Sequence, residues 1–288
     1  MTVGLAIREA AEALTGKSDT PRLDAELLMA HVLGVSRSDL LLRHMNTSPP
    51  PPGFARLVVR RMGHEPVAYI TGEQEFFGLP FRVSPDVLIP RGDSEALVEA
   101  ALKARPGARR VLDCGTGSGA LLLAVLHGLQ QAEGIGIDRS AGALKVAGDN
   151  AERLGLKART QLLMADWTQP SWTKALGQFD LILSNPPYVE VGADLSPSVR
   201  NHEPAGALFA GADGLDDYRV LIPQLHALLT PGGAALVEIG STQAAAVIAL
   251  AHASGMAASL LHDLAGRPRA LEIVHSAKIP LGKGACDL

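Results

Sequence analysis

Four consecutive residues, Asn185-Pro186-Pro187-Tyr188, follow the apolar run 179–184 and combine an amide, two prolines and an aromatic ring. Proline fixes φ, lacks a backbone donor and restricts the residue before it, so the pair predicts a stiff turn at the end of a strand. The turn would orient the Asn185 amide and nearby carbonyls toward one point. That arrangement suits a planar nitrogen substrate, although the tetrapeptide alone is also compatible with a simple strand-ending turn.

The chemistry that this turn could support is transfer of a group to an amide or aromatic amine nitrogen. Such a nitrogen is a poor nucleophile because its lone pair is delocalised. Two acceptors, the Asn185 side-chain oxygen and the Pro186 carbonyl, would fix its plane and help to localise the lone pair, while Tyr188 would offer a stacking or packing face. The rate would then come from alignment and electrostatic stabilisation, without a strong base.

A second candidate site is the glycine-rich segment that follows the apolar residues Val111 and Leu112. The segment consists of Asp113, Cys114, Gly115, Thr116, Gly117, Ser118 and Gly119. Glycines allow a sharp turn and a close approach of the backbone to a ligand, as nucleotide sites of α/β sheets require. Asp138 ends the next predicted strand, 19 residues after Gly119, where a carboxylate can accept both hydroxyls of a ribose.

The glycine spacing departs from the dinucleotide fingerprint G-x-G-x-x-G, because Gly119 comes one residue too soon and Asp113 precedes the first glycine. A pyrophosphate favours a free helix N-terminus, whereas a nearby carboxylate favours a cation. S-adenosylmethionine carries an amino group and a sulfonium, so this pattern predicts a methyl-donor site and disfavours a nicotinamide dehydrogenase. Asp166 and Trp167 follow a further predicted strand, where they could reach the adenine; Trp167 is equally compatible with a core or hinge aromatic.

Composition restricts the remaining classes. The 288 residues are 47% hydrophobic and 19% charged, with a formal net charge of −4, which argues against broad nucleic-acid binding. The only cysteines, Cys114 and Cys286, have no metal-ligand companions, which predicts a reducing cytosol and no metal site. Cys114 is expected to be a packing residue, because no base lies beside it in sequence. The segment 1–14 is predicted to be an amphipathic helix instead of a signal peptide, and no apolar run reaches membrane-spanning length, so we expect a soluble cytoplasmic protein.

The chain is expected to divide into a helical domain at 1–64, a β-hairpin linker at 65–91 and a catalytic domain at 92–288. In the first part, helices are expected from Pro21 to Gly34 and from Phe54 to Met62, on either side of the proline run that begins at Ser48. The linker is expected to hold β-like pieces at 67–70, 75–77 and 81–83, with a turn at 78–80. Asp93 or Ser94 is then expected to cap a helix that ends near Ala104.

Beyond Arg109, short apolar strands alternate with helices, which predicts a doubly wound α/β domain with a parallel sheet covered on both faces. The expected strands are 111–113, 134–138, 161–163, 180–183 and 234–239. The expected helices are 118–130, 140–154, 214–229 and 242–253. Two further strands, near 257–261 and 270–275, are expected to form a hairpin at one edge.

With both motifs in view, the chain resembles the PrmC/HemK family. Further matching segments are Glu65 to Gly72, Glu75-Phe76, Leu88 to Arg91, Glu203-Pro204, Asp213 to Leu215 and Glu238 to Gly240. The tetrapeptide is shared with DNA adenine N6 methyltransferases, so the segments at 65–95 discriminate better. Where the family usually has Arg-Pro-Asp-Thr-Glu, this chain has Arg91-Gly-Asp-Ser-Glu95, in which Ser94 keeps a hydroxyl.

The resemblance implies a Rossmann-like S-adenosylmethionine-dependent methyltransferase that modifies the side-chain nitrogen (N5) of the glutamine in the Gly-Gly-Gln loop of class I peptide chain release factors. S-adenosylhomocysteine would be the product. It implies that Gly115 to Gly119, Asp138, Trp167 and Asn185 contact the methyl donor and that Asn185 to Tyr188 hold the glutamine. The helical domain would help to dock the release factor, with the linker as one wall of the cleft.

Two alternatives remain at this stage. A DNA or RNA amino-methyltransferase of the adenine N6 type could use the same tetrapeptide, although the net charge and the helical front domain count against it. A non-catalytic S-adenosylmethionine-binding protein would belong to a different class, and it would not need the intact Asn185 tetrapeptide.

Overall fold

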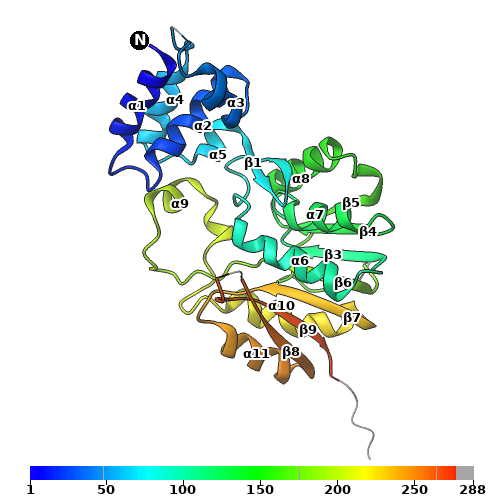
Figure 1. Ribbon diagram of the computed structural model, residues 1–288. Helices are drawn as coiled ribbons and strands as arrows, with labels where there is room; N and C mark the ends of the chain where they lie inside the picture. The colour runs from blue at the N-terminus through cyan, green and yellow to red at the C-terminus, as the bar shows by residue number, and fades with distance from the viewer. Residues whose placement is uncertain (48, 175, 264, 277–288) are drawn as a thin grey trace, which may run out of the picture.

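The computed structural model describes residues 1–47, 49–174, 176–263 and 265–276. Cys286, and Ser48 at the start of the predicted proline break, lie outside these ranges. A helical N-terminal region leads through a short hairpin into a larger α/β region (Figure 1). Within the described ranges, no helix is both long enough and apolar enough to cross a membrane.

The helical region packs its apolar faces around one cluster that includes Ile7, Leu28 and Phe54. Its elements are α1 (Val3–Leu14), α2 (Pro21–Leu33), α3 (Arg37–Asp39), η1 (Leu40–His44), α4 (Phe54–Met62) and α5 (Val67–Thr71). The predicted bounds of α4 are confirmed, and α2 begins at the predicted proline. The sequence signals succeed here because the helical apolar period and the chain breaks agree.

The predicted strand at Val67–Ile70 is wrong, because these residues form helix α5. Pro66 stands at its N-cap, and Gly72 ends it with a φ of 78°. The run is continuously apolar because Ile70 packs into the helical cluster while Ala68 and Tyr69 pack into another. A short run without clear periodicity does not distinguish a buried helix from a buried strand.

The predicted hairpin is present, but its turn lies one residue earlier than expected. Strands β1 (Glu73–Phe76) and β2 (Leu79–Arg82) are antiparallel. The turn is formed by Phe77 and Gly78, with φ values of 53° and 71°, as two-residue hairpin turns require. Pro80 therefore lies in β2 and not in the turn.

The α/β region is built on a seven-stranded sheet in the order β5-β4-β3-β6-β7-β9-β8. Its strands are β3 (Arg110–Cys114), β4 (Glu133–Asp138), β5 (Thr160–Met164), β6 (Phe179–Ser184), β7 (Leu229–Glu238), β8 (Met256–His262) and β9 (Pro268–His275). Neighbours from β5 to β7 are parallel, and β9 pairs antiparallel with both β7 and β8. The predicted doubly wound sheet with an edge hairpin is thus confirmed.

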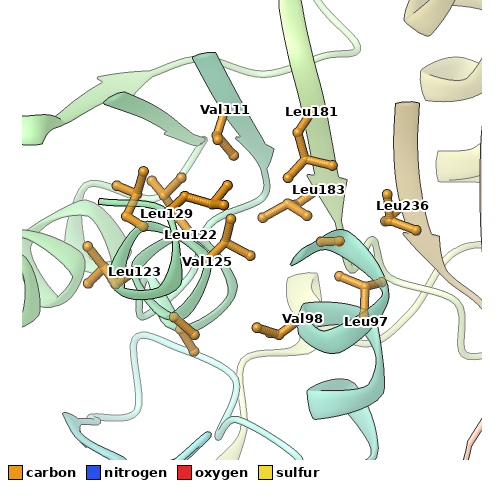
Figure 2. Close-up of a cluster of buried hydrophobic side chains, with 14 of the residues drawn as sticks. Leu97, Val98, Val111, Leu122, Leu123, Val125, Leu129, Leu181, Leu183 and Leu236 are labelled. Atoms are coloured by element: carbon orange, nitrogen blue, oxygen red, sulfur yellow. The ribbon is translucent and has the colours of Figure 1, made fainter. Parts of the chain in front are cut away.

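Helices cover both faces of the sheet, as the continuously apolar strands predict. Leu181, Leu183 and Leu236 point to one face, where they meet α6 (Glu95–Ala104) and α7 (Ala120–Gly128) (Figure 2). The alternate residues Ile182 and Val237 point to the other face, against α10 (Asp216–Leu228) and α11 (Ala244–Ala253). Helix α8 (Ala141–Arg153) follows β4.

Two features of the α/β region differ from the expectation. Ser94 is the last residue of the short turn η2 (Gly92–Ser94) and the N-cap residue of α6, but its side chain makes no capping hydrogen bond. Instead, its hydroxyl donates to Glu238. The short helix α9 (Pro197–His202) and the turns η3 (Lys157–Arg159) and η4 (Ala205–Ala207) were not predicted. Helix α9 reaches the helical region, where the His202 ring contacts the Gly63 carbonyl at 3.1 Å.

Candidate active site

The two sequence motifs meet where the strand order of the sheet reverses. Strands β3 and β6 are neighbours, and Cys114 is opposite Ser184 in their register. The Ser184 hydroxyl donates to the Cys114 carbonyl at 2.9 Å. Gly115 and Asn185 therefore leave the same edge of the sheet side by side, at the switch point where open α/β sheets bind ligands.

A cleft opens at this edge of the sheet. Its floor and walls come from the glycine segment, the ends of β4 and β5, the turn Asn185–Tyr188, the linker and the segment after α9. The lining residues that were predicted as site residues are Gly115, Thr116, Gly117, Ser118, Asp138, Asp166, Trp167, Asn185 and Pro187. The other predicted residues, Asp113, Gly119, Pro186 and Tyr188, are not among those that line the cleft.

The glycine segment forms a left-handed turn that only glycine adopts easily. The φ values are 77° at Gly115, 54° at Gly117 and 81° at Gly119. A Cβ atom on Gly115 would also lie 3.1 Å from the Trp167 ring. The glycines therefore satisfy both a backbone and a space requirement at the floor of the cleft.

Asp138 holds the glycine turn in place. One carboxylate oxygen accepts the Gly117 N–H at 2.9 Å, and the other accepts the Ser140 N–H at 2.9 Å. Each oxygen retains acceptor capacity for a further donor. The predicted role toward ribose hydroxyls is thus compatible with this geometry, and Asp138 also has a structural role that the sequence did not indicate.

Asp113 lies buried beneath the turn, and only 1% of the residue is exposed to solvent. The Thr116 hydroxyl donates to one oxygen at 2.7 Å, while the other oxygen has no hydrogen-bond partner among the described residues. Burial raises the pKa of Asp113 to about 7, the charge of Asp138 adds to the rise, and the Thr116 hydrogen bond opposes it. A cation in the cleft would stabilise the ionised form of this carboxyl.

Asp166 and Trp167 lie at the end of β5, as predicted. The Asp166 carboxylate accepts the Thr168 N–H and hydroxyl at 2.8 Å and 2.7 Å. Burial acts against the ionised form, but these hydrogen bonds and the charge of Arg139 leave the Asp166 pKa below its ordinary value. Trp167 both lines the cleft and donates from its indole nitrogen to Asp217 at 3.0 Å, so its ring is held as a fixed wall.

The turn Asn185–Tyr188 presents two of its four residues to the cleft. Asn185 and Pro187 line it, whereas the Tyr188 ring packs against the core on the α10 and α11 side. The Tyr188 hydroxyl donates to Glu238 at 3.3 Å, and its carbonyl accepts from Gln243 at 3.0 Å. Tyr188 therefore packs against the core, and it is not among the residues that line the cleft, where its predicted face for the substrate would lie.

The linker forms the opposite wall, as the resemblance implies. Phe76, Val87, Leu88, Pro90 and Arg91 line the cleft. Glu203 holds this wall to the segment after α9: its carboxylate pairs with Arg91 and accepts the Ile89 N–H at 3.2 Å. The Glu203 side chain is 1% exposed.

Several lining residues were missed by sequence reasoning. Arg139 directly follows Asp138, lines the cleft and donates to the Gly206 carbonyl at 2.6 Å. Its place at the carboxyl end of β4 is a signal that could have identified it. Asp86 and Gly206 also line the cleft, but they come from loops whose position only the tertiary structure gives.

The cleft fits a cationic nucleoside better than a dinucleotide. Asp86, Asp138 and Asp166 line it and Asp113 lies beneath it, so a pyrophosphate would face several carboxylates. Cys114 is fully buried in the core, where burial raises the pKa of its thiol well above the ordinary value. It is a packing residue, as predicted. Among the described residues, no group of His, Cys, Asp or Glu side chains is arranged to hold a metal ion.

Comparison with known protein families gives two matches. Residues 6–72 match the PrmC N-terminal domain, and residues 107–263 match a methyltransferase domain.

Among similar curated proteins, a release factor glutamine methyltransferase of Moorella thermoacetica is 42% identical over 278 residues, covering 93% of this chain and 97% of its own. One from Bordetella pertussis is 44% identical over 257 residues, covering 86% and 93%. One from Rhodospirillum rubrum is 42% identical over 269 residues, covering 91% and 82%. The similarity therefore spans both the helical and the α/β regions.

A solved methyltransferase from Pyrococcus furiosus has a similar fold. It superimposes with a TM-score of 0.51 at 19% identity, covering 69% of this chain and 89% of its own. This likeness shows the Rossmann-like methyltransferase fold.

Proposed function

The chain belongs to the family of release factor glutamine methyltransferases, and on that premise we propose that it methylates the side-chain amide nitrogen of a release factor glutamine. The glutamine would be that of the Gly-Gly-Gln loop of class I release factors, with S-adenosylmethionine as donor. The observation that carries the proposal is the register of β3 and β6, because it brings Gly115 and Asn185 together at one cleft.

The cofactor, when bound, supplies an electrophilic methyl group on a sulfonium. The residues that would hold it are Gly115 to Ser118 at the floor, Asp138 and Asp166 at the ends of two strands, and Trp167 as a wall. The carboxylates complement the positive charge of the ligand, and the glycine turn lets the backbone approach it closely.

The protein residues at the other end would hold the substrate amide. The Asn185 side-chain oxygen and the Pro186 carbonyl accept its two N–H groups, which fixes the plane of the amide and increases the electron density available at nitrogen. The prolines keep these acceptors in place without reorganisation at the moment of reaction. The proton of the product then leaves to water.

The helical region and the linker would dock the release factor. We place the domain boundaries of this chain at residues 1–64, 65–91 and 92–288. The linker then lies between the helical docking domain and the catalytic domain. The contact of His202 with the Gly63 carbonyl joins the segment after the catalytic turn to the docking region. A substrate of this kind implies a cytoplasmic location.

A methyl-transfer assay with labelled S-adenosylmethionine tests the proposal. The enzyme is offered a release factor, the same release factor with its Gly-Gly-Gln glutamine replaced, duplex DNA and tRNA, and each reaction is repeated with Asn185→Ala. We expect label on the intact release factor only, with a strong reduction in Asn185→Ala. Label on DNA or tRNA alone would instead support the adenine N6 alternative and contradict the proposal.

A further inference from the structure

A buried carboxylate that the reaction scheme leaves without a role lies directly behind the catalytic turn. Glu238 is the last residue of β7 and is 1% exposed. Strand β7 is the parallel neighbour of β6, with Val237 opposite Ser184. Glu238 therefore leaves the sheet at the same level as Asn185, one strand away from it.

The two oxygens of Glu238 join two walls of the cleft. Ser94, which lines the cleft, donates its hydroxyl to Oε2 at 2.5 Å. Tyr188, the last residue of the catalytic turn, donates its hydroxyl to Oε1 at 3.3 Å. The Glu238 backbone carbonyl accepts the Tyr218 hydroxyl at 2.8 Å, which fixes the end of β7 against α10.

The Ser94 and Tyr188 hydroxyls favour an acceptor at this position, whereas burial disfavours the ionised carboxylate. Burial raises the pKa of Glu238, while the Ser94 hydroxyl, the charge of Arg269 and the Tyr188 hydroxyl oppose the rise and the charge of Asp93 adds to it. Burial also raises the pKa of Tyr188, so its phenol stays a donor at neutral pH. A buried carboxyl group with two hydroxyl partners, one at 2.5 Å and one at 3.3 Å, links the positions of the two segments that carry those hydroxyls.

The Asn185–Tyr188 turn is thus held through Tyr188, at its backbone carbonyl and at its hydroxyl. Gln243 donates to the Tyr188 carbonyl and also to the Gly214 carbonyl at 3.2 Å, which fixes the backbone. Glu238 fixes the ring at the other end. Because Tyr188 directly follows Pro187, a shift of the ring is transmitted to the stiff turn and to the Asn185 amide.

We propose that Glu238 is a positioning residue for methyl transfer, which aligns the Asn185–Tyr188 turn through the Tyr188 hydroxyl and aligns the opposite wall through Ser94. This role rests on the proposed function. Since Glu238 touches neither the methyl donor nor the substrate amide, its loss should lower kcat by misalignment and leave donor binding largely intact. A displacement of about 1 Å at reacting groups can cost about 100-fold in rate.

A double-mutant cycle tests whether Glu238 acts through Tyr188. The variants are Glu238→Gln, Tyr188→Phe and the double variant, and the measurements are kcat and KM for the release factor together with calorimetric affinity for S-adenosylmethionine. We expect each single variant to lower kcat about tenfold and the double variant to be within about threefold of the weaker single variant, since both changes remove the same contact. Donor affinity should change less than about threefold.

Ser94 supplies a second pair of variants that does not alter the buried charge. Ser94→Ala removes the hydroxyl and should lower kcat, whereas Ser94→Thr keeps a hydroxyl and should lose less. The matched control is Glu272→Gln on β9. The Glu272 carboxylate does not line the cleft, and it lies 3.4 Å from the Arg105 guanidinium. The kcat of this variant should equal that of the wild type.

The outcomes separate this proposal from the proposed function. The positioning role is wrong if the fall in kcat of the double variant equals the product of the falls in Glu238→Gln and Tyr188→Phe. It is also wrong if donor affinity falls in proportion to kcat. Equal losses in Ser94→Ala and Ser94→Thr would also contradict it. A wild-type enzyme that leaves the release factor unlabelled contradicts the proposed function instead.

Discussion

The two sides of the cleft are held by different kinds of contact. On the side proposed for the donor, the hydrogen bonds of the turn at 115–119 with other described residues join positions at most 32 apart: Thr116 donates to Asp113, Gly117 donates to Asp138, and Asn150 donates to the Ser118 carbonyl. On the substrate side, the contacts join residues far apart in the chain. Ser94 and Glu238 are 144 positions apart, and Ile89 and Glu203 are 114 apart.

The two sides therefore depend on contacts of different range in the sequence. A turn that binds a small ligand can be specified almost completely by glycine positions and one carboxylate, because its geometry is local. A turn that must align a protein side chain with that ligand needs several elements to converge. We therefore expect changes on the donor side to alter donor affinity, and changes on the substrate side to alter rate or stability.

The largest effect is expected from Asn185→Ala. The change removes one of the two acceptors for the substrate amide, so kcat should fall by about 100- to 1,000-fold, as for loss of a preorganised polar group at a reacting centre. Affinity for S-adenosylmethionine, measured by calorimetry, should change by only a few-fold. Asn201→Ala on the exposed face of α9 is the matched control and should keep full activity. A loss of donor affinity equal to the loss of rate would break the proposed division.

The reciprocal effect is expected from Gly115→Ala. A φ of 77° is strained for alanine, and its Cβ would lie 3.1 Å from the Trp167 ring. The left-handed conformation costs a non-glycine residue about 1–2 kcal/mol. We expect the turn to relieve this strain by leaving the geometry that binds the donor, so donor affinity should fall by about 5- to 30-fold.

Gly107→Ala is the control for Gly115→Ala, because its Cβ would meet nothing within 4 Å and its φ is not left-handed. Calorimetric titration of both variants with S-adenosylmethionine gives the comparison. Unchanged donor affinity in Gly115→Ala would show that the glycine turn does not form the donor site.

A smaller effect, on stability, is expected from Glu203→Gln. The change weakens the pair with Arg91 and leaves the buried Ile89 N–H with a poorer acceptor. Because the Arg91 side chain is 39% exposed, we expect a loss of about 1–3 kcal/mol in the free energy of unfolding, at the lower end of the range for a charged hydrogen bond. Urea unfolding measures this loss, and the exposed Glu190→Gln should show none. An unchanged midpoint in Glu203→Gln would mean that this wall is not held by the pair.

The same division explains how much the sequence could predict. The sheet, its edge hairpin and the donor turn were predictable because apolar periodicity and glycine spacing are local signals. The Asn185–Tyr188 turn was selected as a candidate because an amide followed by two prolines is rare and stiff. Its position beside the donor turn followed from the strand-end rule for parallel sheets.

The failures occurred where tertiary contacts decide. Val67–Ile70 is a helix because its apolar side chains pack into two separate clusters, and no local period shows this. Asp93 or Ser94 was expected to cap α6; Ser94 occupies the N-cap position, but its hydroxyl donates to Glu238 and not to the helix. Arg139 and Gly206 come together only when the segment after α9 folds over the end of β4. The substrate side was therefore predicted by resemblance more than by physical reasoning.

A further effect concerns the protonation of Asp113 beneath the glycine turn. The pKa of Asp113 in the folded protein is about 7, above its value of about 3.9 in an unfolded chain. Between these values the folded state binds the proton that the unfolded state has lost, so the contribution of Asp113 to stability decreases as pH rises from about 4 to about 7. Asp113→Asn should flatten this decrease in the free energy of unfolding, measured by urea titration across the range.

The same carboxyl links donor binding to proton release. At pH 7 Asp113 is about half protonated, and a cation above it favours the ionised form, so binding of S-adenosylmethionine should release up to about half a proton. Calorimetry in phosphate and in Tris detects this release, because the two buffers differ in ionisation enthalpy. The observed binding enthalpy should differ between the buffers for the wild type and agree for Asp113→Asn. Equal enthalpies for the wild type would show that the charge of Asp113 does not respond to the donor, and its contribution to the donor side would then be limited to the hydrogen bond with Thr116.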